Sequence, residues 1–367
     1  MTIVFLLAVL ALAYANGAND NFKGVATLYG SGTSSFRRAL ALSTAATILG
    51  SALSIMLARE LVRSFSGRGL VPDALVGETS FLIAVAGGGA ATVLLATRLG
   101  LPTSTTHALT GALVGVSVLH HGKLEAGGML WSGFLQPLLL SPLLAVLAAS
   151  ILSFLATRRR QGPGGAPDAC LCIAETAPEP VSAGPGAPAL RVGSPRGLTV
   201  MVGTDAECAT APAVVRLRTR PVIDWLHELS GASVCFARSV NDTPKIAALW
   251  IGTAGATSWP LVAVTVAVAA GGLLSARRVA ETMSHRITTM DPGLGAIGNL
   301  VTAAIVLGAS RLGMPVSTTH VSVGSIMGIG AISRRANGRV IGQVLLAWLV
   351  TLPLGALLGG VLFSRLH

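Results

Sequence analysis

Long apolar stretches, separated by short polar segments, run through most of the chain. We count ten hydrophobic passes, five on each side of a different segment at 157–221. Passes of about 20 residues match the length that a helix needs to cross a hydrocarbon core of ~30 Å. The pattern therefore predicts an all-α polytopic membrane protein, whose passes are residues 2–30, 39–58, 80–97, 103–120, 129–156, 230–252, 259–276, 293–310, 316–333 and 340–363.

The segment 157–221 interrupts this pattern. It contains 9 of the 18 prolines of the chain, with many Gly, Ala and Ser residues and no helical period. Such a composition cannot build a packed core, so we predict a disordered or loosely ordered linker. Arginines flank it at both ends, which by the positive-inside rule places it in the cytoplasm. The chain then divides into a first transmembrane repeat at 1–156, the linker at 157–221 and a second transmembrane repeat at 222–367.

The composition indicates a multi-pass protein of the cell membrane that faces lipid. Only 11% of the residues are charged and 52% are hydrophobic, whereas soluble domains carry about 25% charged residues. The formal net charge of +11 does not indicate nucleic acid as a partner, because the arginines lie in short clusters with few aromatic residues. Residues 2–15 resemble a signal peptide, but we expect no cleavage, since the residues that follow belong to an internal repeat.

The two halves contain the same polar motifs in the same order. A shift of 222 residues aligns Asn-Asp-x-x-Lys at 19–23 with the same motif at 241–245. A shift of 213 residues aligns Gly-x-Pro-x-Ser-Thr-Thr-His at 100–107 with its second copy at 313–320. We interpret this as an internal duplication. Because five passes is an odd number, we expect the second copy to enter the membrane from the opposite side, as in the inverted repeats of secondary transporters.

The runs at 100–107 and 313–320 are candidates for an anion site. Gly, Pro and hydroxyl residues interrupt an apolar pass there, so we expect broken helices or re-entrant hairpins. Ser and Thr can cap the helix that follows, and its free N–H groups and positive dipole end suit a tetrahedral anion. Ordinary Ser and Thr packing in membrane helices is the alternative, which the duplication disfavours.

Asp20 and Asp242 lie inside apolar passes, where an ionisable side chain is by default a functional candidate. Lys23 and Lys245 follow three residues later, a spacing that puts each lysine on the same helix face as its aspartate. The lysines could offset the aspartates or bind an anion directly. Pro244 suits a first helical turn, so we expect a second broken segment capped at or next to Asp242.

Other polar residues are weaker candidates. His107 and His320 could relay protons, or could brace the broken helices as neutral hydrogen-bonding residues. Asn299 could add an oxygen ligand. Cys170 and Cys172 form a C-x-C pair without partnering histidines, so we expect no metal site and no cofactor.

These motifs together resemble the inorganic phosphate transporter (PiT) family. The resemblance is carried by Gly-Ala-Asn-Asp at 17–20, Ser-Val-Asn-Asp at 239–242 and the paired Pro-x-Ser-Thr-Thr-His runs, and it covers both membrane halves. It implies an inverted-repeat secondary carrier, commonly a homodimer, driven by sodium or protons, with inorganic phosphate held between the Asn-Asp segments and the Ser-Thr-Thr hairpins. With the two lysines added from their spacing, the expected substrate-binding residues are Asn19, Asp20, Lys23, Ser104, Thr105, Thr106, Asn241, Asp242, Lys245, Ser317, Thr318 and Thr319.

One departure from the family pattern concerns the driving ion. The family motif usually continues to an Asn three residues after the Asp, where this chain has Lys23 and Lys245. An amide oxygen can ligate sodium, whereas an ammonium group cannot. The lysines also oppose Asp20 and Asp242 and bring the local fixed charge close to zero. We therefore expect a proton-coupled phosphate symporter.

Three alternatives remain besides sodium coupling. The first is a permease for sulfate or a related oxyanion, which the aspartates disfavour because sulfate has no proton to donate to a carboxylate. The second is a membrane enzyme, but the chain contains no nucleophile elbow and no His-Glu-x-x-His motif. The third is a receptor or ion channel, and saturable exchange of labelled anion distinguishes a carrier from these.

Overall fold

The computed structural model describes residues 1–66, 71, 75–121, 127–160, 169–175, 198–204, 213–254 and 259–367. These residues divide into two units, one formed by Met1–Ser153 with Leu226–His367, the other by Phe154–Trp225. The described residues of the first unit are mainly helical, and they include an isolated bridge between Thr288 and Ala336. The first unit contains every residue that the sequence analysis assigned to a site.

The helices of the first half agree with the predicted passes. The first pass is broken after Asp20, and the second is followed by a bend of 83°. The elements are α1 (Thr2–Asp20), η1 (Lys23–Val25), α2 (Ala26–Gly30), α3 (Phe36–Leu57), α4 (Arg59–Phe65), α5 (Thr79–Arg98), α6 (Thr105–His121), α7 (Gly127–Leu130), η2 (Trp131–Leu135) and α8 (Gln136–Arg160).

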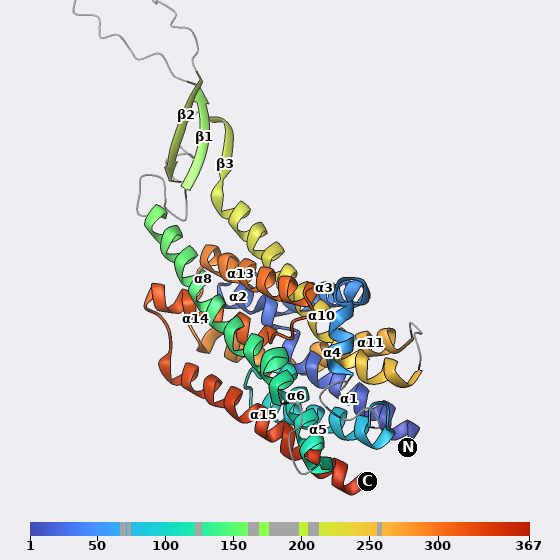
Figure 1. Cartoon of the computed structure of the whole chain (residues 1–367). Coiled ribbons are helices and arrows are strands. Elements are labelled where there is room, and N and C mark those ends of the chain that lie inside the picture. Colours follow the sequence, from blue (N-terminus) through green and yellow to red (C-terminus); the bar gives the residue numbers. More distant parts are fainter. Residues whose placement is uncertain are drawn as a thin grey trace, which may run out of the picture. The chain divides into compact units, whose positions relative to one another are not determined.

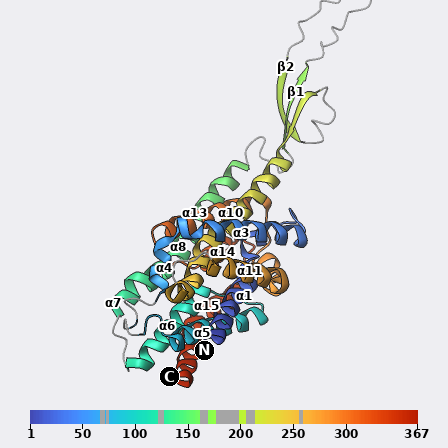
Figure 2. The same cartoon turned by 90° about the vertical axis from the view of Figure 1, so that its right-hand side faces the viewer.

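The second half has one continuous helix, α10, where the first half has α1, η1 and α2. Both chain ends lie on the same side of the helical unit (Figures 1 and 2). Capping side chains begin three helices of the second half: Asp291, Ser317 and Asn337 each accept from a backbone N–H three residues later. The elements are α10 (Thr219–Ala254), α11 (Trp259–Ser275), α12 (Arg277–Glu281), η3 (Thr282–Arg286), α13 (Pro292–Arg311), α14 (Thr318–Ser333) and α15 (Gly338–Leu366).

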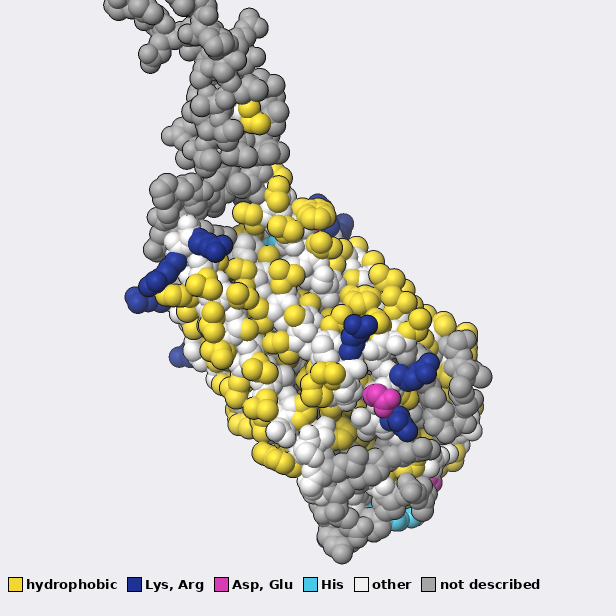
Figure 3. All heavy atoms as spheres, turned by 45° about the horizontal axis from the view of Figure 1, so that its top comes forward, with side chains coloured by type: hydrophobic (Ala, Val, Ile, Leu, Met, Phe, Trp, Pro, Cys, Tyr) yellow, Lys and Arg dark blue, Asp and Glu magenta, His cyan; other side chains and the backbone are white. Residues whose placement is uncertain are grey.

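Five helical segments within the described residues are long and apolar enough to cross a bilayer, or seven when two bent pairs are counted as spans. The two helices that follow the Ser-Thr-Thr motifs, α6 and α14, have 17 and 16 residues and fall short of that length. Each instead forms a hairpin with the long helix before it, α5 or α13. Hydrophobic side chains cover most of the described surface in the view of Figure 3, as expected of a protein whose solvent is lipid.

Small residues let the helices of the first unit pack closely. α1 packs against α11 and α5, while α15 packs against α5 and α6. A Cβ at Gly17 on α1 would lie 1.9 Å from the carbonyl oxygen of Val268 on α11, so only glycine fits there. Close backbone contact of this kind stabilises helix association in lipid.

The described strands of the second unit correct the prediction of a disordered linker for their own residues, while 161–168, 176–197 and 205–212 lie outside the described residues. Three segments of the second unit form an antiparallel sheet in the order β2-β1-β3: β1 (Ala169–Glu175), β2 (Leu198–Thr204) and β3 (Ala213–Arg218). Each strand has only six or seven residues. The overall Pro- and Gly-rich composition of the segment concealed these short aliphatic runs in the sequence analysis.

Candidate functional site

The two Asn-Asp motifs lie in different backbone settings. In the first copy, α1 ends at Asp20, and the chain passes through a turn into the short helix η1, which begins at Lys23. In the second copy, α10 continues through Pro244 to Ala254. The expected break and cap at Asp242 are therefore wrong, because the helix accommodates the proline within its interior. All twelve predicted substrate-binding residues are buried.

The two hairpins have matching tips. At each tip a glycine with positive φ reverses the chain, at +71° for Gly100 and +68° for Gly313. The helix that follows is capped as predicted: Ser104 Oγ accepts from the N–H of His107 at 3.1 Å, and Ser317 Oγ accepts from the N–H of His320 at 3.3 Å. The serine hydroxyls are thus engaged in holding the starts of α6 and α14.

The two histidines brace the hairpins against each other. The Nδ1 atoms of His107 and His320 lie 3.0 and 2.6 Å from the same capping hydroxyls. Their rings stack with centroids 4.3 Å apart. The histidines therefore join the first helical turns of α6 and α14, which come from different copies of the repeat.

The lysines bond across the two copies. Lys23 Nζ donates to Thr319 Oγ1 of the second copy at 2.5 Å, and Lys245 Nζ donates to Thr106 Oγ1 of the first copy at 2.7 Å. Thr106 and Thr319 are equivalent under the 213-residue shift. Each lysine also pairs with its own aspartate and donates to the carbonyl oxygen just before a hairpin serine, Thr103 O at 2.7 Å or Val316 O at 2.9 Å.

Each asparagine of the Asn-Asp motifs holds its own hairpin. Asn19 Nδ2 donates to Thr97 Oγ1 at 2.9 Å, and its Oδ1 accepts from the N–H of Thr103 at 3.0 Å. Asn241 Oδ1 accepts from Ser310 Oγ at 3.1 Å. Ser310 is the counterpart of Thr97 under the 213-residue shift. Asn241 Nδ2 also lies 3.3 Å from Thr318 Oγ1, which places the last predicted threonine in the cluster.

Asn16, which the sequence analysis missed, joins the two aspartates. Its Nδ2 lies 2.9 Å from Asp20 Oδ2 and 3.2 Å from Asp242 Oδ2, and 3.0 Å from Thr105 Oγ1. The carboxylates from the two copies therefore share one amide donor. The Oδ1 atom of Asn16 accepts a hydrogen bond from Arg238 Nη1 at 3.1 Å.

Arg238 is the second residue missed. It is fully buried, and it also donates to Thr47 Oγ1 at 2.7 Å. Two signals could have found it: an arginine inside an apolar pass is a functional candidate by default, and the 222-residue shift maps Asn16 onto Arg238. Among the described residues, three buried cations now face two buried carboxylates here. The sequence analysis counted only the two lysines, so Arg238 adds a third basic side chain to this cluster.

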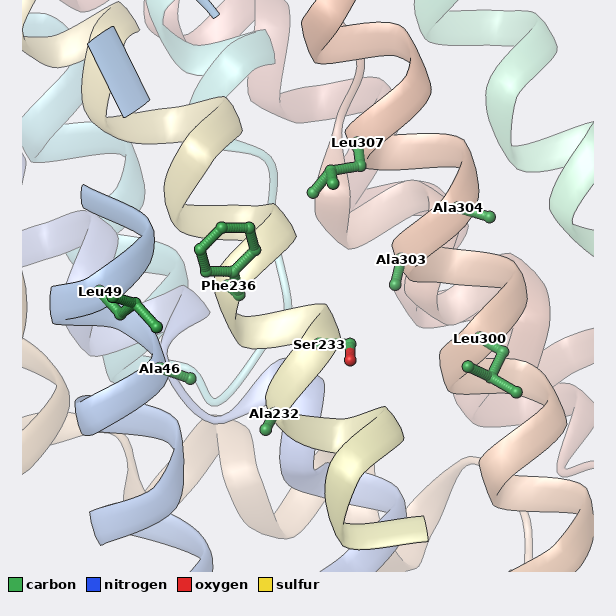
Figure 4. Close-up of a pocket in the computed structure, with 9 residues that line it drawn as sticks. All are labelled: Ala46, Leu49, Ala232, Ser233, Phe236, Leu300, Ala303, Ala304 and Leu307. Carbon is green, nitrogen blue, oxygen red and sulfur yellow. The ribbon is translucent and has the colours of Figure 1, made fainter. Parts of the chain in front are cut away.

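Two other features lie apart from this cluster. Asn299, proposed as an oxygen ligand, bonds instead to Thr27 at 2.9 Å and Ser230 at 3.2 Å. A groove of about 480 Å³ between α3, α10 and α13 has an apolar lining in which the hydroxyl of Ser233 is bonded to the carbonyl oxygen of Leu229 (Figure 4). This groove is unsuited to an anion.

A multi-pass helical protein with duplicated polar motifs buried among its helices has the architecture of a membrane transporter. The model of the phosphate transporter family matches residues 16–359, so the chain belongs to that family. A probable low-affinity inorganic phosphate transporter of Mycobacterium bovis is 29% identical, across all of this chain and 78% of that protein. The corresponding protein of Mycobacterium leprae is 26% identical, with the same coverage.

The fold also has a solved counterpart. A structure described as the sodium-dependent phosphate transporter superposes with a TM-score of 0.74 at 19% identity, covering 100% of this chain and 99% of that one. At this identity the likeness establishes the fold. Family membership and fold together confirm the resemblance inferred from the motifs.

Proposed function

We propose that this protein is a secondary active transporter of inorganic phosphate in the cell membrane, coupled to protons. The phosphate is held where the two Asn-Asp motifs meet the tips of the α5–α6 and α13–α14 hairpins. The twelve residues predicted from the sequence line this position, with Asn16 and Arg238 supporting them. The relatives named as phosphate transporters support the substrate.

The observation that carries the proposal is the exchange of lysine contacts between the copies. Lys23 donates to Thr319 and Lys245 donates to Thr106. The hairpin of each copy therefore binds the ammonium group of the other copy. An anion that enters between the hairpins meets both ammonium groups and the first turns of α6 and α14. These are the groups that bind phosphate elsewhere in proteins.

The surroundings of Lys23 favour protons over sodium as the coupling ion. Four oxygens surround its ammonium group: those of Asp20, Asn19, Thr103 and Thr319. An all-oxygen shell of this kind suits a small hard cation. Here the shell already holds a covalently attached cation, so a sodium ion is not needed to offset the carboxylates. The solved counterpart is named as sodium-dependent, so the coupling ion that we propose for this chain, the proton, differs from the ion in that name.

The two aspartates support phosphate over sulfate as the substrate. Near neutral pH phosphate keeps a proton that it can donate to Asp20 or Asp242, whereas sulfate is an acceptor only. A sulfate ion between two buried carboxylates would leave acceptors facing acceptors. Uptake of labelled phosphate that a large excess of sulfate does not inhibit supports this assignment.

We further propose an alternating-access mechanism with the second repeat inverted relative to the first, a homodimeric assembly and a cytoplasmic position for 157–221. The matched contacts of the two copies support the first point: Asn19 with Thr97, and Asn241 with Ser310, are equivalent pairs. A site built equally from both copies can be closed on either side by the same hairpin movement.

The experiment is phosphate uptake by the purified protein in liposomes, with sodium and proton gradients set independently. We expect uptake in sodium-free buffer with an inward proton gradient, abolished by a protonophore. Asp20→Asn serves as the inactive control. Uptake that requires sodium and ignores the protonophore contradicts proton coupling, whereas Lys23→Asn with Lys245→Asn producing sodium dependence supports the role of the lysines directly.

A further inference from the structure

A polar cavity of about 750 Å³ opens beside the tip of the first hairpin. Its walls come from α1, the end of α5, the end of α11, α12 and η3. We call it the arginine vestibule, because its lining includes Arg98, Arg277, Arg278 and Arg286. Polar and apolar groups share its walls, in contrast to the apolar groove of Figure 4.

The arginine vestibule is strongly basic. Its four arginines are exposed, and Glu281 is the acidic residue that the lining contains. Arg278 is held in place by a hydrogen bond of 2.8 Å from Nη1 to the carbonyl oxygen of Arg98. Guanidinium groups are weakly hydrated and bind phosphate groups with two parallel hydrogen bonds. A concave surface of one charge concentrates counter-ions of the opposite charge.

The inner wall of the vestibule touches the proposed transport site. Thr97 lines the cavity, and its Oγ1 accepts from Asn19 Nδ2 at 2.9 Å. Tyr14, two residues before Asn16, lines it as well, and its hydroxyl lies 2.6 Å from Ser275 Oγ. One hydrogen bond therefore separates the vestibule wall from the first Asn-Asp motif.

The second hairpin tip has different neighbours. Gly100 at the first tip lies against Arg278 and Thr282, whereas Gly313 at the second tip lies against Glu60. Glu60 is the counterpart of Thr282 under the 222-residue shift. The duplication thus supplies the same hairpin twice, with Arg278 and Thr282 beside the first tip and Glu60 beside the second.

We propose that the arginine vestibule is a second phosphate-binding site, through which free phosphate passes between the surrounding water and the transport site at Asn19. The inference rests on the proposed function for the identity of the anion. Arg277 and Arg286 recruit the anion, and the loosening of the contact between Thr97 and Asn19 admits it to the central site.

The test is thiol labelling at Ser275→Cys in nanodiscs of neutral phosphatidylcholine, where both faces are accessible. Three cysteines, Cys170, Cys172 and Cys208, are replaced by Ser, and the buried Cys235 is retained. The labelling reagent is an anionic or a cationic methanethiosulfonate. The rate at which each reagent modifies the introduced cysteine is divided by its rate with a small free thiol. Asp20→Asn is included, so that the measurement does not depend on transport.

We expect the anionic reagent to react roughly tenfold faster than the cationic one. Inorganic phosphate should slow the reaction of the anionic reagent both in the Ser275→Cys protein, which is the parent here, and in the same protein with Asp20→Asn added. Arg277→Gln with Arg286→Gln should remove the preference, while Arg339→Gln, an exposed arginine outside the cavity lining, should preserve it.

Three results overturn the proposal: equal normalised rates for both reagents, a preference that survives Arg277→Gln with Arg286→Gln, or protection by added anionic lipid but not by inorganic phosphate. The last result assigns the cavity to a lipid headgroup. If the charge preference and the phosphate protection hold while the parent protein transports no phosphate, the vestibule stands and the proposed function fails.

Discussion

Lys23→Met tests how much the buried contacts of Lys23, within its own repeat and to the other repeat, stabilise the protein. The substitution keeps an unbranched side chain of similar length but removes the ammonium group. It removes the ion pair with Asp20 and hydrogen bonds of 2.8 Å to Asn19, 2.7 Å to Thr103 O and 2.5 Å to Thr319. Removing one partner of a buried pair leaves an uncompensated charge, which destabilises a protein by about 3–5 kcal/mol.

The chain supplies a matched control for this change. Arg63 and Glu60 form an ion pair with the same three-residue spacing, at 3.4 Å, but their side chains are 78% and 59% exposed. Exposed pairs contribute about 0–1 kcal/mol. Lys23→Met should therefore lower the free energy of unfolding several times more than Arg63→Met, measured by denaturant titration of the purified proteins in the same micelles.

The double variant Asp20→Asn with Lys23→Met completes the cycle. It removes both charges at once, so we expect it to recover a large part of the stability that Lys23→Met loses. If Lys23→Met is no less stable than Arg63→Met, or if the double variant is as unstable as the sum of the single variants, the buried pair does not exist as described.

Further predictions concern transport. Arg238→Gln removes a charged hydrogen bond to Asn16, worth about 1.5–3 kcal/mol; the KM for phosphate should rise about tenfold or more, and an unchanged KM contradicts a supporting role. Asp20→Asn or Asp242→Asn should abolish concentrative uptake while the protein remains inserted, and normal uptake by both would move the site elsewhere. Deleting 162–188 removes the central strand β1 but none of the site residues; liposome uptake should remain largely intact, and its loss in a correctly inserted protein would reveal a regulatory role.

The helical passes could be predicted because they depend on hydrophobicity, which is a local property of the sequence. The duplication then indicated which polar residues to expect in one site, because both copies of the Asn-Asp and Ser-Thr-Thr motifs lie in the same buried cluster. The path of the backbone at Pro244 could not be predicted in this way. A proline is compatible with both a helix start and a helix interior in a membrane protein, and packing by neighbouring helices decides between them.

Asn16 and Arg238 illustrate a different limit. Equal residues such as Asn19 and Asn241 reveal the repeat in the sequence, whereas positions at which the two copies differ carry no such signal. Asn16 and Arg238 occupy equivalent positions and bond to each other, so their difference is what makes the contact. The distances that bring Thr106 to Lys245 across 139 residues also depend on tertiary packing, which no local pattern contains.

The crossed lysine contacts have a consequence for how this sequence can change over time. Lys23 and Thr319 lie in different copies, as do Lys245 and Thr106, so the binding partner of each lysine is encoded in the other half of the gene. A substitution in one copy alters the surroundings of a residue in the other copy rather than in its own. The two halves, although free to diverge on their lipid-facing surfaces, must therefore evolve as one unit at these four positions.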